Sequence, residues 1–337
     1  MKTLYFDNHT KSLCAIDQTK LPGSLEYIYI SDAKSLYDAI KALKIRGAPA
    51  IGVAAALGIY SCALRFEDKS VDGFIYSLKK TAEFIKTARP TAHDLFYAAD
   101  RMVNAALTAQ CNSVEGILEI LLEEAQSVFD ENLAECRAIG EFGAELLKNG
   151  DTVLTHCNAG SLCAVEYGTA LSPIYVAASQ GKRIKVYADE TRPLLQGARL
   201  TSYELTEAGI DTTVICDSMA ASLMQHGKID IIITGCDRVA ANGDFANKVG
   251  TLSLAINAKY YGVPFYIAAP SSTVDRTIAD GSKIVVEQRN GKEISDYWYS
   301  SPMIHKKAKC DYNPAFDVVP HELISGFITE KGIVKSI

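Results

Sequence analysis

The spacing of apolar residues changes near residue 150, and this change predicts two kinds of architecture. Before it, one short strand is expected at 27–30, where Tyr and Ile alternate. Asp32 is then expected to cap a helix that runs to Ala42. Apolar residues at helical spacing predict further helices at 50–66, 71–86, 93–108 and, as one or two helices, 113–149. Arg89-Pro90-Thr91 interrupts this series between the third and fourth helices.

After Gly150, short apolar runs rich in β-branched residues alternate with helical segments. The expected strands are 152–155, 183–188, 212–215, 229–234 and 264–269. This alternation is typical of βαβ units. The predicted fold class is therefore α/β: a C-terminal Rossmann-like parallel sheet with helices on both faces, preceded by a smaller, mainly helical domain with a few short strands. The expected domains are 1–125 and 126–337.

The segment 47–64 carries no formal charge and invites comparison with a membrane span. It is rich in Ala and Gly rather than Leu, and it opens with Ala48-Pro49. We interpret it as a tightly packed buried helix. The first 13 residues contain charges and no apolar core, so they do not resemble a signal peptide.

Composition narrows the class of protein. The 337 residues include 34 Lys and Arg against 40 Asp and Glu, a net charge of −6, and 48% are hydrophobic. These values indicate a globular chain, and the mildly acidic balance argues against nucleic acid or an anionic membrane as a partner. Nine irregularly spaced cysteines without a CxxC pair favour reduced thiols in a cytoplasmic protein.

Polar turns follow the predicted strands. Open α/β sheets bind ligands beyond the carboxyl ends of their strands. The fold prediction therefore brings Cys157, Asp189, Asp217 and Asp237 towards one edge of the sheet. The turns are His156-Cys157-Asn158-Ala159-Gly160, Asp189-Glu190-Thr191-Arg192, Asp217-Ser218, Gly235-Cys236-Asp237-Arg238 and Pro270-Ser271-Ser272-Thr273.

Several familiar sites are absent from the sequence. It has no GxGxxG after the first strand, no GxxxxGK[ST], no HExxH and no GxSxG. His156 and Cys157 are adjacent, but no second pair completes a metal site. Two anion-binding signals remain, because Arg46-Gly47-Ala48-Pro49 and Asn247-Lys248 are each expected to open a helix beside a cation.

Distinctive motifs run in order along almost the whole chain. They are Ile45-Arg46-Gly47-Ala48-Pro49-Ala50-Ile51-Gly52, Arg89-Pro90-Thr91, Thr155-His156-Cys157-Asn158-Ala159-Gly160, Tyr167-Gly168-Thr169-Ala170-Leu171, 189–200, Gly235-Cys236-Asp237-Arg238, 242–251, 313–317 and 328–332. Together they resemble the motifs of the methylthioribose-1-phosphate isomerases. The wider family also contains ribose-1,5-bisphosphate isomerases and regulatory subunits of the translation-initiation nucleotide-exchange factor.

The resemblance implies an aldose-ketose isomerase of methionine salvage that acts as a homodimer without metal or organic cofactor. Its catalytic pair maps onto Cys157 and Asp237, which the non-catalytic subunits generally lack. Phosphate binding maps onto Arg46, Gly47, Ala48 and Arg89. Binding of sugar hydroxyls maps onto Gln196, and binding of hydroxyl or phosphate maps onto Asn247 and Lys248.

Three departures from the family pattern bear on the substituent at C5 of the sugar. The chain has Cys236 where the family usually has Ala, and Cys163-Ala164 where Ala-Thr is usual. It also has His93-Asp94 where an apolar residue and Asn are common. The alternatives to the methylthio sugar are 5-deoxyribose 1-phosphate and ribose 1,5-bisphosphate. A non-catalytic regulatory or nucleotide-sensing subunit is the alternative from another class.

The implied chemistry assigns roles to the catalytic pair. Because the anomeric oxygen carries phosphate, the ring cannot open as a free sugar does. We hypothesise that Asp237 protonates the ring oxygen and then accepts a proton from the C2 hydroxyl, which needs a carboxyl kept protonated near neutral pH. Cys157 either shuttles a proton between C2 and C1 or stabilises a hydride transfer.

Other polar residues near the expected site are interpreted as structural. His156 is expected to be a hydrogen-bonded structural histidine, and Cys163 and Cys236 are expected to pack. Without the resemblance, Gln196 would be a helix-surface amide. A structural network is expected among Asp189, Glu190 and Arg192.

Overall fold

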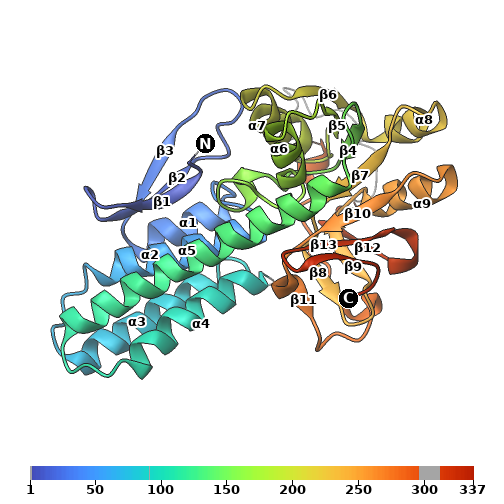
Figure 1. Ribbon diagram of the computed structural model, residues 1–337. Coiled ribbons are helices and arrows are strands. Elements are labelled where there is room, and N and C mark those ends of the chain that lie inside the picture. Colours follow the sequence, from blue (N-terminus) through green and yellow to red (C-terminus); the bar gives the residue numbers. More distant parts are fainter. Residues whose placement is uncertain (1, 91, 296–311) are drawn as a thin grey trace. The chain divides into compact units, whose positions relative to one another are not determined.

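The computed structural model describes residues 2–90, 92–295 and 312–337 (Figure 1). The chain divides into two compact units. The first is Met1–Cys136 with Ser161–Gly168, and the second is Arg137–Gly160 with Thr169–Ile337. Thr91 of the Arg89-Pro90-Thr91 motif and one of the nine cysteines, Cys310, lie outside the described ranges.

The first unit combines a small antiparallel sheet with a group of helices that run side by side (Figure 1). The sheet has the order β1-β2-β3. Its strands are β1 Leu4–Asp7, β2 Ser12–Ile16 and β3 Tyr27–Ile30. The helices are α1 Ala33–Lys41, α2 Ala48–Ala63, α3 Val71–Lys86, α4 His93–Thr108 and α5 Val114–Glu145, whose end belongs to the second unit.

Helix α2 forms the centre of the first unit. Every residue from Ala50 to Ala63 is buried. Its small residues allow this, because a Cβ on Gly52 would lie 3.1 Å from the Asp94 carbonyl oxygen of α4. A Cβ on Gly58 would lie 2.5 Å from Leu36 Cδ2 of α1. The interpretation of this segment as a buried helix is confirmed, and within the described ranges no helix has the length and apolarity needed to span a bilayer.

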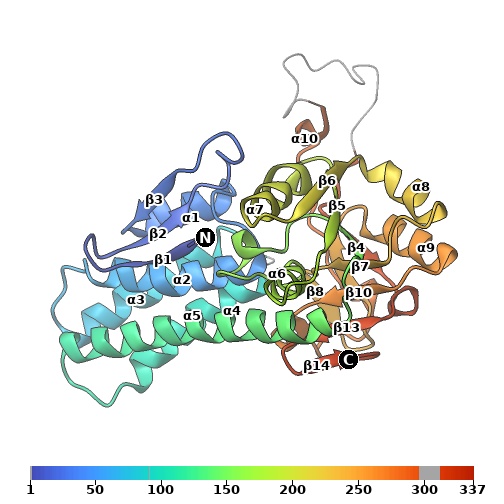
Figure 2. The ribbon, with the colours of Figure 1, turned by 45° about the horizontal axis from the view of Figure 1, so that its top comes forward.

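The second unit contains a seven-stranded sheet of order β14-β13-β10-β7-β4-β5-β6. All neighbours are parallel except β13 and β14. Helices α6 and α7 cover one face of the sheet, and α8 and α9 cover the other (Figure 2). The strands are β4 Thr152–Thr155, β5 Lys185–Asp189, β6 Asp211–Ile215, β7 Ile231–Thr234, β10 Phe265–Ala268, β13 Gly326–Thr329 and β14 Gly332–Val334. The helices are α6 Ser172–Ser179, α7 Ser202–Glu207, α8 Ala220–Gln225 and α9 Thr251–Tyr261.

A second, four-stranded sheet of order β11-β8-β9-β12 is inserted in the same unit. Its strands are β8 Arg238–Ala240, β9 Phe245–Lys248, β11 Val274–Asp275 and β12 Phe316–Val319. Short helical turns lie between the larger elements. These are η1 Ser161–Cys163 in the first unit, and the π-helical η2 Gly197–Thr201, η3 Asp217–Met219, η4 Ser271–Thr273, η5 Gly281–Lys283, η6 His321–Leu323 and the one-turn helix α10 Lys292–Ser295 in the second.

The predicted fold class is confirmed, and the five strands expected after residue 150 appear as β4, β5, β6, β7 and β10. The sequence pattern missed β8 and β9, which lie where a loop and a helix start were expected, and it also missed β1, β2 and β11 to β14. The prediction that Asn247-Lys248 opens a helix is wrong. Both residues end β9, whose pairing with β12 keeps the chain extended to Lys248, and a turn at Val249-Gly250 then precedes α9, which begins at Thr251.

Candidate active site

The strand order reverses between β4 and β7, and this reversal positions the predicted catalytic pair. Strands β5 and β6 follow on one side of β4, whereas β7 and β10 follow on the other. A crevice forms where connections diverge in this way, beyond the carboxyl ends of the strands. Cys157 comes two residues after β4, and Asp237 comes three residues after β7. The parallel pairing of these strands therefore brings both residues to the same edge at the point of reversal.

The turns that carry these two residues touch. A Cβ added to Gly235, after β7, would lie 2.8 Å from the Ala159 Cβ, after β4. The backbone of Asp237 is anchored, because its N–H donates to the Ala246 carbonyl oxygen at 2.8 Å. Asp237 itself is half-buried. Glycine at position 235 thus permits the close approach of the two turns.

Cys157 adopts a left-handed backbone conformation, with φ of +64°. This conformation costs an L-residue other than glycine about 1–2 kcal/mol. Two hydroxyl groups hold it: the Cys157 N–H donates to Thr191 Oγ1 at 2.8 Å, and Thr201 Oγ1 donates to the Cys157 carbonyl at 2.6 Å. Both threonines are fully buried, whereas Cys157 is half-buried.

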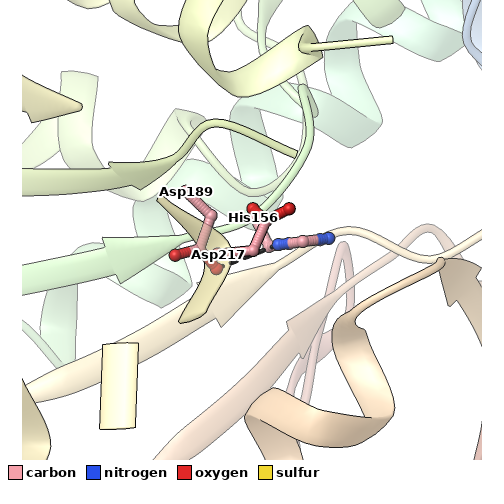
Figure 3. Close-up of side chains that lie close together, drawn as sticks. All are labelled: His156, Asp189 and Asp217. Atoms are coloured by element: carbon pink, nitrogen blue, oxygen red, sulfur yellow. Dashed lines mark hydrogen bonds and ion pairs between the residues drawn. The ribbon is translucent and has the colours of Figure 1, made fainter. Parts of the chain in front are cut away.

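His156, the residue before Cys157, lies beside the carboxylates of Asp189, which ends β5, and Asp217, which follows the neighbouring β6 (Figure 3). Its Nδ1 lies 2.9 Å from Asp189 Oδ2, and its Nε2 donates to the Val249 carbonyl at 2.9 Å. Burial alone would lower the pKa of His156, but the hydrogen bond to Asp189 and its charge outweigh burial and raise this pKa to about 9. The interpretation of His156 as a hydrogen-bonded structural histidine is confirmed.

The donor atoms of His156, Asp189 and Asp217 lie within 4.8 Å of one another, as they would around a metal ion. Most of these donor atoms already take part in hydrogen bonds within the protein. Both ring nitrogens of His156 are bonded, and the two Asp217 oxygens accept the Thr191 and Arg192 N–H groups at 2.8 Å. Among the described residues, Asp189 Oδ1 is left without a hydrogen bond. We therefore interpret the cluster as a network that fixes the turns after β4 and β5.

Gln196 is buried immediately before η2, unlike the helix-surface amide that it would be without the family resemblance. Its Oε1 accepts no hydrogen bond from the described part of the chain. The backbone packs closely here, because a Cβ on the next residue, Gly197, would lie 1.7 Å from the Asp189 carbonyl oxygen. A buried acceptor of this kind is suited to a hydroxyl donor.

Asn247 and Lys248 lie at the end of β9. Asn247 is buried and its Nδ2 donates to Thr251 Oγ1 at 2.9 Å. Lys248 Nζ donates to the Ala315 carbonyl at 3.1 Å and lies 4.8 Å from the centre of the Phe316 ring. His156 is joined to the residue after Lys248, so β9 and the Cys157 turn are connected within the second unit.

The four predicted phosphate-binding residues belong to the first unit. Gly47 caps α2 with φ of +94°, as the helix-opening motif predicted, and Ala48 begins the helix. A Cβ on Gly47 would lie 2.5 Å from the Cys163 Cβ, so no side chain fits there. Arg46 precedes α2 and Arg89 precedes α4, and both are half-buried. Because the first turns of these helices are in contact, the two arginines lie at the same end of the helical group.

Comparison with known proteins identifies the family. The model of the initiation factor 2 subunit family matches residues 44–336. The chain belongs to this family. Within it, a methylthioribose-1-phosphate isomerase of Parabacteroides distasonis is 50% identical over 97% of this chain and 98% of the relative. A 5-deoxyribose 1-phosphate isomerase of Bacillus cereus is 48% identical over 96% and 93%.

Solved structures of the same family share the fold. A 5-methylthioribose 1-phosphate isomerase from Pyrococcus horikoshii superposes with a TM-score of 0.92 at 38% identity, covering 99% of this chain and 92% of that one. A structure described as translation initiation factor eIF-2B, subunit delta, from A. fulgidus gives 0.89 at 43% identity, covering 99% and 96%. The resemblance of the sequence motifs to the methylthioribose-1-phosphate isomerases is thereby confirmed.

Sequence reasoning missed the residues that hold the turn after β4. Thr191 and Thr201 were not singled out, and neither was the buried Glu204, which accepts a hydrogen bond from Asn158 Nδ2. Thr191 was visible as part of the polar turn after a predicted strand. The Thr191 hydroxyl is important because it holds Cys157 in a left-handed backbone conformation. A single sequence carries no signal of that conformation.

The raised pKa of His156 predicts how stability depends on pH. A histidine with a pKa of about 6.5 in the unfolded chain and about 9 when folded contributes fully below pH 6.5 and loses its contribution as the pH rises through 9. We expect the stability advantage of the wild type over His156→Gln to shrink between pH 6.5 and 9. Urea unfolding at several pH values measures this, with the exposed His226→Gln as control. An advantage that stays constant across this range would contradict the assignment.

Proposed function

We propose that this protein converts 5-methylthioribose 1-phosphate into 5-methylthioribulose 1-phosphate, an aldose-ketose isomerisation in methionine salvage. The observation that carries the proposal is the position of Cys157 and Asp237 after adjacent strands, where the strand order reverses. The relatives named as methylthioribose-1-phosphate isomerases, up to 50% identical, support the same activity.

In the proposed reaction, Asp237 is the acid and base. It gives its proton to the ring oxygen as the bond between that oxygen and C1 breaks, and the resulting carboxylate later takes the proton from the C2 hydroxyl. The hydrogen on C2 moves to C1, so C2 becomes the ketone and the acid is regenerated. This route transfers only hydrogen within the substrate and needs no external oxidant or cofactor.

Cys157 acts on the hydrogen that moves from C2 to C1. In one route, its thiolate removes the C2 proton and the thiol returns a proton to C1, through an enediol-type intermediate. In the other route, the hydrogen moves as a hydride and Cys157 stabilises the polar transition state. Reaction in deuterated water separates the two, because solvent deuterium at C1 of the product excludes pure hydride transfer.

The family resemblance assigns substrate binding to seven residues. The substrate phosphate is held by the guanidinium groups of Arg46 and Arg89 and by backbone N–H groups of Gly47 and Ala48. The absence of space for a side chain at Gly47 supports a backbone contact. Three further residues are assigned to the substrate. Gln196 binds sugar hydroxyls through its buried oxygen, and Asn247 and Lys248, at the end of β9, bind a hydroxyl or the phosphate.

The second candidate is the same chemistry on 5-deoxyribose 1-phosphate. Relatives named for that activity are 48% identical over almost the whole chain. A methyl group or a methylthio group at C5 each needs an apolar lining, whereas ribose 1,5-bisphosphate would need a second cationic pocket. The regulatory-subunit alternative is disfavoured by the presence of both Cys157 and Asp237.

We also propose that the protein is a cytoplasmic homodimer. All eight cysteines in the described ranges are free thiols, which suits a reducing compartment. Light scattering coupled to gel filtration is expected to give about twice the chain mass of 36.5 kDa. A mass of one chain at micromolar concentration would contradict the dimer.

The decisive test compares three sugars. Purified protein is incubated separately with 5-methylthioribose 1-phosphate, 5-deoxyribose 1-phosphate and ribose 1,5-bisphosphate, and ketose formation is followed by NMR. We expect the highest kcat/KM for the methylthio sugar. Cys157→Ser and Asp237→Asn are each expected to lower turnover by at least about 100-fold, because each removes a group that transfers or stabilises a proton.

The matched controls are a cysteine and an aspartate next to strands of the same sheet. Cys216→Ser changes an exposed cysteine after β6, and Asp230→Asn changes an exposed carboxylate before β7, at the opposite edge from Asp237. Both are expected to retain wild-type turnover. Preference for another sugar would change the substrate but keep the chemistry. No turnover of any sugar by folded protein would refute the enzyme assignment and favour the regulatory subunit.

The phosphate assignment is tested with two arginines near opposite ends of α2. Arg46→Ala is expected to lower kcat/KM by roughly 10- to 100-fold, since a hydrogen bond to a charged group contributes about 1.5–3 kcal/mol. The control is Arg65→Ala, because Arg65 donates to the carbonyls of Thr10, Lys11 and Ser61. Equal kinetics for the two variants would remove Arg46 from the phosphate site.

A further inference from the structure

Cys157 is held by hydroxyl groups on both sides of its backbone. Its N–H donates to Thr191 Oγ1 at 2.8 Å, and its carbonyl accepts from Thr201 Oγ1 at 2.6 Å. The two threonines lie ten residues apart, at the turn after β5 and at the end of η2. Both are completely buried, so water does not compete for these bonds.

The direction of each hydroxyl group is fixed by a second partner. Thr191 Oγ1 donates its proton to the Asp189 carbonyl at 3.0 Å, which leaves a lone pair for the Cys157 N–H. Thr201 Oγ1 gives its proton to Cys157 and accepts from Asn158 Nδ2 at 3.3 Å. Neither hydroxyl can rotate without losing a buried hydrogen bond.

Thr191 is itself strained, which indicates that its position is enforced. Its φ is +64°, in the left-handed region that β-branched residues rarely enter. Its N–H donates to Asp217 Oδ1 at 2.8 Å, and the next N–H, of Arg192, donates to Asp217 Oδ2 at 2.8 Å. One carboxylate thus holds the strained threonine that in turn holds the strained cysteine. Such strain persists only where the surroundings over-determine it, and it concentrates at functional sites.

We propose that Thr191 and Thr201 are positioning residues, whose hydroxyl groups hold Cys157 in its left-handed conformation and so set the direction of its thiol. The inference rests on the proposed function for its effect on turnover. It does not rest on that function for its effect on the thiol. Neither threonine touches the reacting atoms in this assignment, and both act through the backbone of Cys157.

The hydroxyl group, not the volume of the side chain, carries this effect. Thr→Val keeps the shape of the side chain and removes the hydrogen bond, whereas Thr→Ser keeps the hydrogen bond. The chain offers a matched control in Thr234, the last residue of β7. It is also completely buried, but its Oγ1 has no hydrogen-bond partner within the described residues. Thr234→Val therefore removes a buried hydroxyl without removing a bond.

The experiment uses the full chain with Thr191→Val, Thr201→Val, the two serine variants and Thr234→Val. Isomerase kinetics give kcat and KM. In parallel, iodoacetamide labelling of the native protein is quantified by peptide mass spectrometry as the rate at Cys157 divided by the rate at the exposed Cys216. Near-UV circular dichroism verifies that each variant is folded. Because the two threonines are tested separately, one folded valine variant is sufficient to test the proposal.

We expect the valine variants to lower kcat about 10- to 100-fold with KM changed less than threefold, and to change the labelling ratio at least threefold. The serine variants and Thr234→Val should stay within threefold of wild type in both measurements. Valine variants with wild-type kcat and labelling ratio would overturn the proposal, as would serine variants as impaired as valine ones. If the wild type isomerises none of the sugars, the proposed function fails, and the labelling ratio alone decides whether the hydroxyl groups position the thiol.

Discussion

The reversal of strand order at β4 is the constraint on which the candidate site depends. Because β5 and β6 continue on one side of β4 and β7 and β10 on the other, the connections after β4 and β7 diverge at one edge of the sheet. Any residue that follows either strand reaches that edge. Cys157 and Asp237 come from chain positions 80 residues apart, and the sheet needs no other device to bring their turns together. Glycine at position 235 permits the two turns to approach, because a side chain there would collide with Ala159.

Strand order brings residues to an edge, but it does not orient them. Orientation comes from one later segment, residues 189–204, which bonds three successive residues of the turn after β4. Asp189 holds His156, Thr191 and Thr201 hold Cys157, and Glu204 holds Asn158. Hydrogen bonds in a buried polar network of this kind fix one conformation, and of its members Asp189 keeps one oxygen, Oδ1, without a partner in the described part of the chain. The same segment carries Gln196, whose buried Oε1 has no hydrogen-bond partner within the described residues.

The periodicity of the sequence was sufficient for five of the seven strands of the large sheet and for most helices, because burial on both faces of a parallel sheet imposes a continuous apolar run. It failed at β9, since Asn247 and Lys248 have no strand-like pattern and pair through β12, about 70 residues away. The proposed catalytic and binding residues came from motif resemblance, not from periodicity. A sequence motif identifies residues, but it does not specify their backbone angles. The left-handed conformations of Cys157 and Thr191 and the burial of Gln196 therefore became visible only in three dimensions.

The strain at Cys157 is itself an argument for function. Glycine adopts a φ of +64° without steric cost, so a structural turn at this position would be more stable with glycine than with cysteine. The chain instead keeps a side chain there, and it uses two buried hydroxyl groups and the Asp217 carboxylate to hold it. A packing thiol would not need this, because the same small apolar volume fits many unstrained positions. The arrangement is explained if the direction of the thiol matters, which is the requirement of a group that must act on a hydrogen moving between two carbons.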